Sequence, residues 1–189
     1  MTVDQRGLIE RARDGEHDAF AELLDARLAR LDAAARLILR DSELARDAVQ
    51  ETLIRTWRDL PGLRDPDRFD AWLHRLTVNT CLDIARHRRR RPIEVEITPL
   101  DAPTASDVSS HLADRELVDK ALRGLDPGHR AVVALHYLLG MPLPQVATSL
   151  GIPVGTAKSR LHYALAAMRI SATAEPDTAP DPVPGGQVA

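Results

Sequence analysis

The sequence predicts an all-α protein of two small helical domains joined by a flexible linker. Apolar residues recur every three or four positions through most of the chain, which is the spacing of one helix face. Aromatic residues, which are enriched in strands, make up only 3% of the 189 residues. Residues 92–112 hold three prolines and four acids without Lys or Arg, and show no helical periodicity. We therefore expect domains at 1–91 and 113–170, an acidic linker at 92–112 and a disordered tail at 171–189.

Composition limits the classes of protein to which the chain can belong. Hydrophobic residues make up 44% of the sequence, which is enough for packed helical cores. No stretch approaches the roughly 18 consecutive apolar residues of a membrane span, and residues 1–16 lack an apolar signal core. Cys81 is the single cysteine, which excludes an internal disulfide. We expect a cytoplasmic protein without membrane insertion.

Four helices are predicted in the N-terminal domain, because breaker residues separate four runs of helical periodicity. Gly15 ends the first helix, and the pair Asp41-Ser42 caps the third. A loop with two prolines separates the third helix from the fourth. The predicted helices cover about residues 4–14, 18–38, 43–60 and 68–89, and the loop covers 61–67.

The third predicted helix has two distinct faces. At about 100° per residue, small side chains such as Ala45, Ala48 and Thr52 point toward the domain core. The opposite face mixes carboxylates with a large apolar and an aromatic side chain, a composition typical of a protein-binding patch. The alternative is an ordinary tryptophan half-buried at a helix end. This opposite face consists of Asp47, Gln50, Glu51, Ile54 and Trp57.

The fourth predicted helix ends in a run of arginines. Position 86 and positions 88–91 are all arginine, and Pro92 terminates the run. Basic residues at a helix C-terminus interact favourably with the helix dipole, so a capping role would explain some of them. Because the run exceeds what capping needs, contact with nucleic acid is the favoured interpretation.

The C-terminal domain is predicted to end in a helix-turn-helix. Helices at about 113–123 and 127–139 come first, and Asp126-Pro127 supplies an N-cap and a first-turn proline for the second of them. Residues 142–169 then form two helices, which Gly151-Ile152-Pro153 separates.

The second helix of this motif presents a polar and basic face. No acidic residue lies between Asp126 and Glu175, and this stretch contains Arg130, Lys158, Arg160 and Arg169. Such local positive charge in a chain of net charge −3 favours a phosphate backbone as the partner. An ordinary helical hairpin with solvated charges is the alternative. The residues offered to a DNA groove are Gly155, Thr156, Lys158, Ser159, Arg160 and Tyr163.

An enzyme receives little support from the sequence. It contains no glycine-rich phosphate loop, paired-carboxylate site or nucleophile motif. His74, Cys81 and His87 fall on one predicted helix, but their angles around it do not bring all three to one metal ion. We expect no catalytic residue, no cofactor and no metal.

Two groups of short motifs, one in each predicted domain, follow each other along the chain. The first group is Asp47-x-x-Gln50-Glu51, Trp57, and Phe69-x-Ala71-Trp72-Leu73 followed by Val78-Asn79. The second is Gly151-Ile152-Pro153-x-Gly155-Thr156-x-Lys158-Ser159-Arg160-Leu161. With both groups in this order and at this spacing, the chain resembles a bacterial RNA polymerase sigma factor of the sigma-70 family, extracytoplasmic-function (ECF) group, over about residues 5–170.

The resemblance implies a promoter-specificity subunit with no active site of its own. In this family the first domain binds core RNA polymerase and the minus-ten promoter element, and the second domain binds the minus-thirty-five element. The resemblance assigns polymerase binding to Asp47, Gln50, Glu51, Ile54 and Trp57. It assigns minus-ten binding to Leu63, Arg64, Trp72, Arg75, Asn79, Asp83 and Arg86. It assigns minus-thirty-five binding to Gly155, Thr156, Lys158, Ser159, Arg160 and Tyr163.

The chain departs from the family pattern at a few positions. Leu63 stands where many relatives have an aromatic residue in the loop that captures a base, and Tyr163 and Leu165 stand where arginine is common. We therefore expect minus-thirty-five binding to depend mainly on Lys158 and Arg160. The family also implies an anti-sigma factor that holds the chain inactive. The second hypothesis is a free-standing helix-turn-helix regulator that binds operator DNA.

Overall fold

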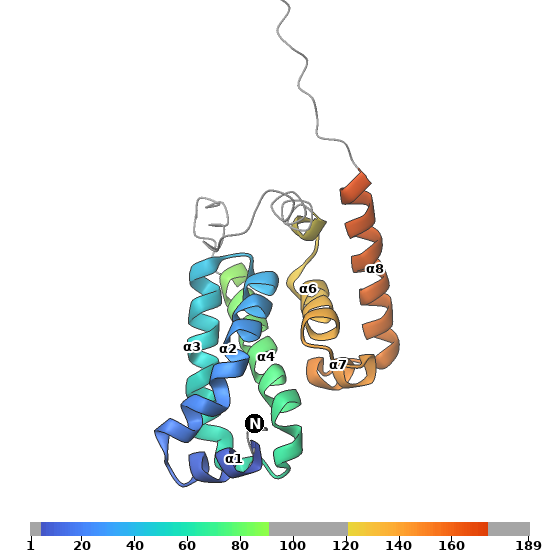
Figure 1. Cartoon of the computed structure of the whole chain (residues 1–189). Helices are drawn as coiled ribbons and strands as arrows, with labels where there is room; N and C mark the ends of the chain where they lie inside the picture. Colours follow the sequence, from blue (N-terminus) through green and yellow to red (C-terminus); the bar gives the residue numbers. More distant parts are fainter. Residues whose placement is uncertain (1–4, 91–120, 174–189) are drawn as a thin grey trace, which may run out of the picture.

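Helices make up the regular structure of the part of the chain that is described. The structure is a computed structural model that describes residues 5–90 and 121–173, and within those ranges there is no strand. The all-α prediction is confirmed. The predicted linker, most of the helix predicted at 113–123 and most of the tail lie outside the described residues. Figure 1 shows two groups of helices side by side, one from each half of the chain.

The first group follows the predicted helices closely. Asp41 caps the third helix, since its carboxylate accepts hydrogen bonds from the backbone N–H groups of Glu43 at 3.1 Å and Leu44 at 3.0 Å. Two short 3-10 turns occupy the predicted loop. The elements are α1 Gln5–Arg13, α2 His17–Leu39, α3 Ser42–Asp59, η1 Leu60–Gly62, η2 Pro66–Arg68 and α4 Phe69–Arg90.

The second group contains the predicted helix-turn-helix, α7 Leu143–Leu150 and α8 Val154–Thr173. Gly151 ends α7 with a φ of +63°, a left-handed conformation that strains residues with a Cβ. The helix predicted at 127–139 is α6 Pro127–Val133, which then widens into the π-helical turn η3 Ala134–Leu138. The backbone N–H of Leu139 donates to the carbonyl of Ala134 at 2.9 Å, which makes this last turn wider than an α-helical one.

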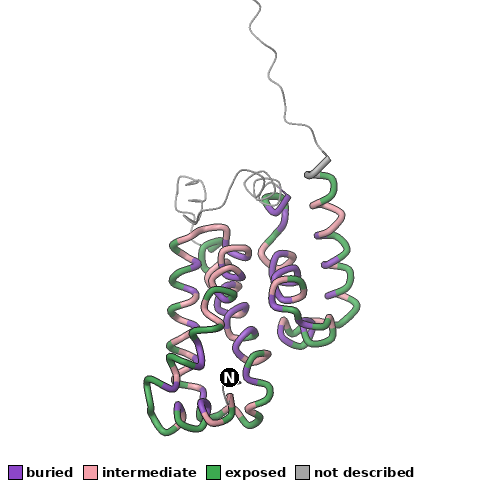
Figure 2. The backbone as a smooth tube through the Cα atoms, in the orientation of Figure 1, coloured by how far each residue is buried: buried purple, intermediate pink, exposed green. Residues whose placement is uncertain are grey.

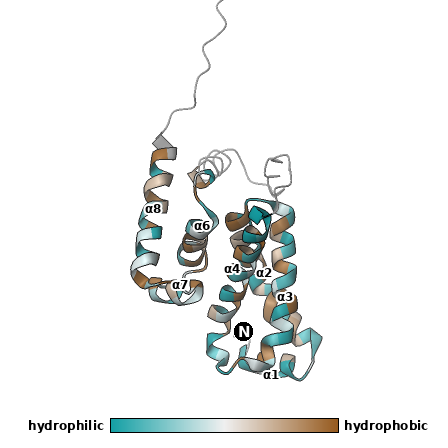
Figure 3. Ribbon diagram, turned by 180° about the vertical axis from the view of Figure 1, so that it is seen from behind, coloured by the Kyte–Doolittle hydropathy of each residue, from teal (hydrophilic) through white to brown (hydrophobic). Residues whose placement is uncertain are grey.

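Two clusters of buried apolar side chains stabilise the fold. Figure 2 shows the buried residues along the helices of both groups. The smaller cluster joins α1, α2 and the start of α4, and includes Ile9, Leu23, Leu31, Phe69 and Leu73. The larger cluster extends from α2 and α4 into the second group, and includes Ile38, Val78, Val132, Leu135 and Val146. In the view from behind, hydrophobic residues gather where α2, α4 and α6 face one another (Figure 3). The two groups therefore share buried apolar surface.

Arg130 connects the two groups through buried hydrogen bonds. Its side chain is 8% exposed; Nε donates to the carbonyl of Ile38 at 2.7 Å, and Nη1 donates to the carbonyl of Leu125. Burial, and then the nearby Arg40, lower the pKa of Arg130 to about 10. Arg30 reaches the opposite way and donates to the carbonyl of Leu138 at 2.7 Å. Arg130 belongs to the stretch whose positive charge predicts DNA contact, but it is buried and therefore does not contribute to a DNA-binding surface.

The buried His74 predicts a pH-dependent stability. Burial lowers its pKa below the ordinary value near 6.5; Asp70 acts in the opposite sense, and Arg30 and Arg27 add to the lowering. As the pH falls, His74 is protonated in the unfolded chain before it is protonated in the folded chain. Its contribution to the free energy of unfolding is therefore fully present above about pH 6.5 and is lost as the pH falls through the folded pKa. We expect a smaller free energy of unfolding at pH 5.5 than at pH 7.5 in urea titrations. The variant His74→Gln should lose most of that difference, and an unchanged difference would mean that another group titrates.

Candidate functional site

The predicted protein-binding face lies on the solvent side of α3, and we call it the α3 patch. Its residues are Asp47, Gln50, Glu51, Ile54 and Trp57. Asp47 and Gln50 are exposed, and the side chain of Ile54 is 55% exposed. The opposite side of the helix is buried through Ala45, Ala48 and the two threonines Thr52 and Thr56. The structure therefore brings the five predicted residues to one face, where an exposed isoleucine among polar groups is available to a protein partner.

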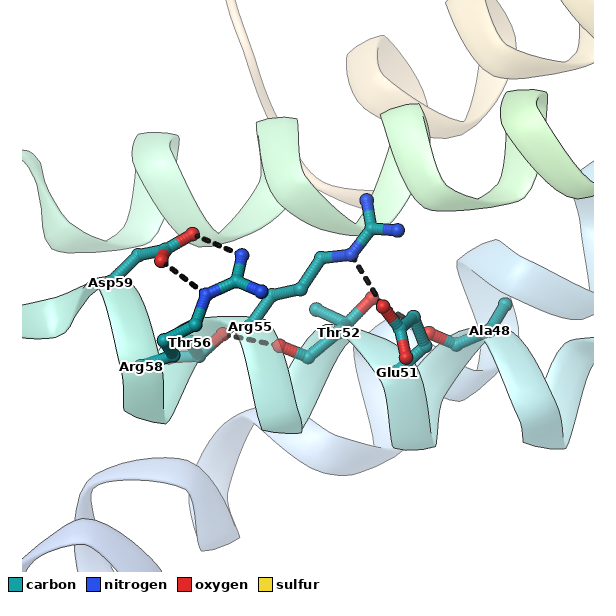
Figure 4. Close-up of polar contacts among 7 residues, drawn as sticks. All are labelled: Ala48, Glu51, Thr52, Arg55, Thr56, Arg58 and Asp59. Atoms are coloured by element: carbon teal, nitrogen blue, oxygen red, sulfur yellow. Dashed lines mark hydrogen bonds and ion pairs between the residues drawn. The ribbon is translucent and has the colours of Figure 1, made fainter.

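Local hydrogen bonds pair the polar side chains of α3 (Figure 4). The hydroxyls of Thr52 and Thr56 donate to the carbonyls one turn earlier, each at 2.7 Å, so neither buried hydroxyl is left unpaired. Arg55 Nε donates to Glu51 at 2.7 Å. Hydrogen bonding from Arg58 holds the pKa of Asp59 below its usual range. Glu51 is thus half-buried and paired, whereas Asp47 is exposed.

Trp57 is supported by the start of α2. Its ring stacks on His17 with centroids 4.6 Å apart and meets the ring of Phe20 edge-on at 4.9 Å. The side chain is only half-buried, so part of it remains at the surface beside Ile54. Trp57 therefore anchors the end of α3 and also contributes to the patch.

A groove of about 700 Å³ brings together the first four predicted minus-ten residues. Leu63 and Arg64 from the loop line one part, and Trp72 and Arg75 from α4 line another. Arginines beside a half-buried tryptophan suit a single strand, because cations neutralise phosphates and an aromatic ring can stack on a base. Asp65, Arg68 and Ala71 also line the groove from the first group. The second group contributes the rest of the lining, mainly through Pro144, Gln145 and Thr148 of α7.

The other three predicted minus-ten residues lie farther along α4. At about 100° per residue, Asn79, Asp83 and Arg86 share the side of the helix that carries Trp72, but they do not line the groove. Arg86 pairs with Asp83 at 2.6 Å. These positions extend the surface toward the basic end of α4.

The arginine run has a partly structural role. Arg88 reaches Asp41, the N-cap residue of α3, at 2.9 Å. Arg89 and Arg90 are exposed, and Arg91 lies outside the described residues. Arg88 therefore connects α4 to the start of α3, and Arg89 and Arg90 face solvent.

Four of the six α8 residues that the sequence predicts to contact DNA are exposed. Ala157, Leu161 and Ala164 are buried, and the exposed predicted residues are Gly155, Lys158, Ser159 and Tyr163. Thr156 and Arg160 are half-buried.

The start of α6 supports this side of α8. The ring of Tyr163 lies 4.8 Å from that of His129, which pairs with Asp126. The guanidinium of Arg160 lies over Gly128, where an added Cβ would approach its Nη1 to 3.4 Å. Burial alone would raise the pKa of Asp126, but the hydrogen bonds from His129 and Gly128 lower it.

Helix α1, predicted at about residues 4–14, has a role that its sequence did not indicate. In the structure, polar side chains of α1 contact the loop between α3 and α4, among them Gln5, Arg6 and Arg13. The partners are 47 to 61 residues away in sequence, so no local pattern could have indicated these contacts.

Other kinds of site find little support within the described ranges. Among residues 5–90 and 121–173, no three His, Cys, Asp or Glu side chains are placed to hold a metal ion. Cys81 is fully buried, and burial raises its pKa to about 12, which makes it unreactive. None of the helices described is long and apolar enough to cross a membrane.

Comparison with known families matches both helix groups. Residues 23–91 match the family model of sigma-70 region 2, and residues 115–168 match that of sigma-70 region 4. The chain is 38% identical to the ECF RNA polymerase sigma factor SigL of Mycobacterium tuberculosis over 153 residues, which cover 79% of this chain and 86% of that protein. It is 34% identical to the RNA polymerase sigma-E factor of Streptomyces coelicolor over 155 residues, 82% of this chain and 86% of that one.

Solved structures give the same likeness. The structure of CnrH in complex with the cytosolic domain of CnrY superposes with a TM-score of 0.64 and 29% identity, covering 88% of this chain and 95% of that one. The sigma factor RpoE of Bartonella quintana, crystallised with the anti-sigma factor NepR, superposes with a TM-score of 0.69 and 23% identity, covering 83% and 98%. The latter likeness supports the fold alone.

Proposed function

The chain belongs to the sigma-70 family, in its extracytoplasmic-function group, and from this premise we propose how its surfaces serve transcription initiation. It is an alternative sigma factor, which binds core RNA polymerase and directs initiation at specific promoters. The observation that carries this function is the presence of region 2 and region 4, at residues 23–91 and 115–168, in one chain. A free-standing operator-binding regulator would not need the first of these regions.

The proposed polymerase contact is the α3 patch. Its support is the exposed Ile54 between Asp47 and Gln50, with Glu51 and Trp57 held in place by Arg55 and His17. An apolar anchor surrounded by fixed polar groups is the composition expected of an interface centre.

The proposed promoter contacts lie on the two helix groups. The groove at Leu63, Arg64, Trp72 and Arg75 would hold the unpaired minus-ten strand, and Asn79, Asp83 and Arg86 would continue that path along α4. The exposed side of α8 would enter the major groove of the minus-thirty-five element. Its residues are Gly155, Thr156, Lys158, Ser159, Arg160 and Tyr163.

We propose that the chain acts in the cytoplasm and that the polymerase alone carries out the catalysis of transcription. We also propose an anti-sigma factor as an inhibitory partner, which is supported by the similarity of the fold to the sigma factor RpoE, solved in complex with the anti-sigma factor NepR. Pull-downs with the tagged chain from unstressed cells would contradict this partner if they recovered no small protein that competes with polymerase.

Gel filtration with sigma-free core polymerase tests the function directly. We expect the purified chain to co-elute with core polymerase, and to shift duplex promoter DNA weakly when polymerase is omitted. Tight binding of the free chain to duplex DNA, without co-elution, would instead favour the operator-binding regulator.

A further inference from the structure

We propose that helix α1 positions the minus-ten loop, residues 60–68, and that Arg13 and Gln5 are the positioning residues. This inference rests on the proposed role of that loop in capturing a base. These two side chains would affect DNA binding through the loop, without contacting DNA themselves.

The loop has few backbone hydrogen bonds of its own. Pro61 and Pro66 lack an N–H group, and the backbone bonds inside the loop are those of Leu63 to Leu60 and of Arg68 to Asp65, each at 3.1 Å. Such a segment can take several shapes unless other elements hold its carbonyl groups.

Helix α1 supplies donors along the length of this loop. Arg13 donates through Nε to the carbonyl of Leu60 at 3.3 Å and through Nη2 to the carbonyl of Leu63, so one guanidinium spans η1. Gln5 Nε2 donates to the carbonyl of Pro66 at 3.1 Å, at the start of η2. The planar fork of arginine can make both bonds at once, which a lysine ammonium on its flexible stem does not reproduce.

The donors are themselves fixed by the core. Leu8, Ile9 and Ala12 bury the other side of α1. The side-chain oxygen of Gln5 accepts a hydrogen bond from Arg27 Nη2 at 2.7 Å. Arg27 also pairs with Asp70 at 2.5 Å and lies 5.3 Å above the ring of Phe69. The loop is therefore tied through α1 to α2 and to the start of α4.

Fixing the carbonyl of Leu63 also fixes the place where Leu63 and Arg64 enter the groove. Extruding a base from its stack is unfavourable, so a pocket that is already formed binds it better than one that must be ordered. The contact of Arg6 with Asp67 lies in solvent, with side chains 65% and 62% exposed, and should matter little. The half-buried Arg13 and Gln5 carry the effect.

The test uses holoenzyme reconstituted from core polymerase and the full chain. The probe is a single-stranded DNA pool with ten randomised positions, and sequencing of the bound fraction gives the enrichment at each position. We expect Arg13→Ala and Arg13→Lys to reduce enrichment at least tenfold at the captured position, with affinity for core polymerase within twofold of wild type. Arg11→Ala is the matched control, because Arg11 lies on the same helix but pairs with Glu16 at 2.8 Å.

Each outcome bears on the proposal. Unchanged enrichment in the Arg13 variants, or an equal loss at every position, would overturn the positioning role. Thermal unfolding shows whether each variant folds. If Arg13→Ala does not fold, the positioning role is tested with Arg13→Lys and Gln5→Met, which retain the side-chain length. A wild-type holoenzyme that enriches no sequence would reject the minus-ten assignment itself, and the positioning role with it.

Discussion

We expect the substitution Ile54→Asp to lower the affinity for core RNA polymerase by roughly 100-fold, about 2.7 kcal/mol. Ile54 is the exposed apolar side chain of the α3 patch, and a carboxylate in its place would have to be desolvated at the interface. Because the side chain is 55% exposed, the free energy of unfolding should change by less than about 0.5 kcal/mol. Fluorescence anisotropy of the labelled chain, titrated with core polymerase, measures the affinity.

Charge changes around Ile54 should have smaller effects that depend on salt. Reversal of Asp47 and Glu51 to arginine should lower the association rate more than it raises the dissociation rate. Asp25→Arg is the matched control, since Asp25 is an exposed acid on α2 outside the patch. Normal binding by Ile54→Asp, with the fold intact, would remove this face of α3 from the polymerase interface.

We expect Lys158→Ala and Arg160→Ala each to weaken holoenzyme binding to a duplex minus-thirty-five fragment by roughly tenfold or more. Lys158 is exposed near the N-terminus of α8. If it contacts a phosphate, Lys158→Ala should reduce the slope of log affinity against log salt concentration by about one unit. Arg160 is half-buried over Gly128, so its guanidinium is held in one orientation and should discriminate between bases. Titrations at several salt concentrations, with native and altered elements, separate the two effects.

The same helix supplies a control for this experiment. Arg169 is an exposed arginine on a similar side of α8 to Lys158, and it lies about 16 Å farther along the helix axis than Lys158. We expect Arg169→Ala to bind within about twofold of wild type. An equal loss in Arg169→Ala and Lys158→Ala would indicate general attraction to DNA, and would contradict a contact surface at the start of α8.

Local features of the sequence determined the helices of this protein. Asp41 and Gly151 mark helix ends because a carboxylate cap and a left-handed glycine act on neighbouring backbone groups. The α3 patch and the exposed side of α8 were also predictable, since residues three or four positions apart share a face of a helix. The motifs on those faces then indicated the family, which the comparisons confirmed. The individual contacts assigned to them stay predictions.

The tertiary structure alone decided which charged side chains face solvent and which hold elements together. In sequence, Arg130 looked like part of a basic DNA surface, but it is buried against Ile38, 92 residues away. Arg88 pairs with Asp41, 47 residues away at the start of α3, and Arg13 holds a loop about 50 residues farther along the chain. Helical periodicity gives the direction of a side chain around its own axis. It does not say which neighbouring helix lies in that direction, because that depends on how the apolar faces of several helices pack at once.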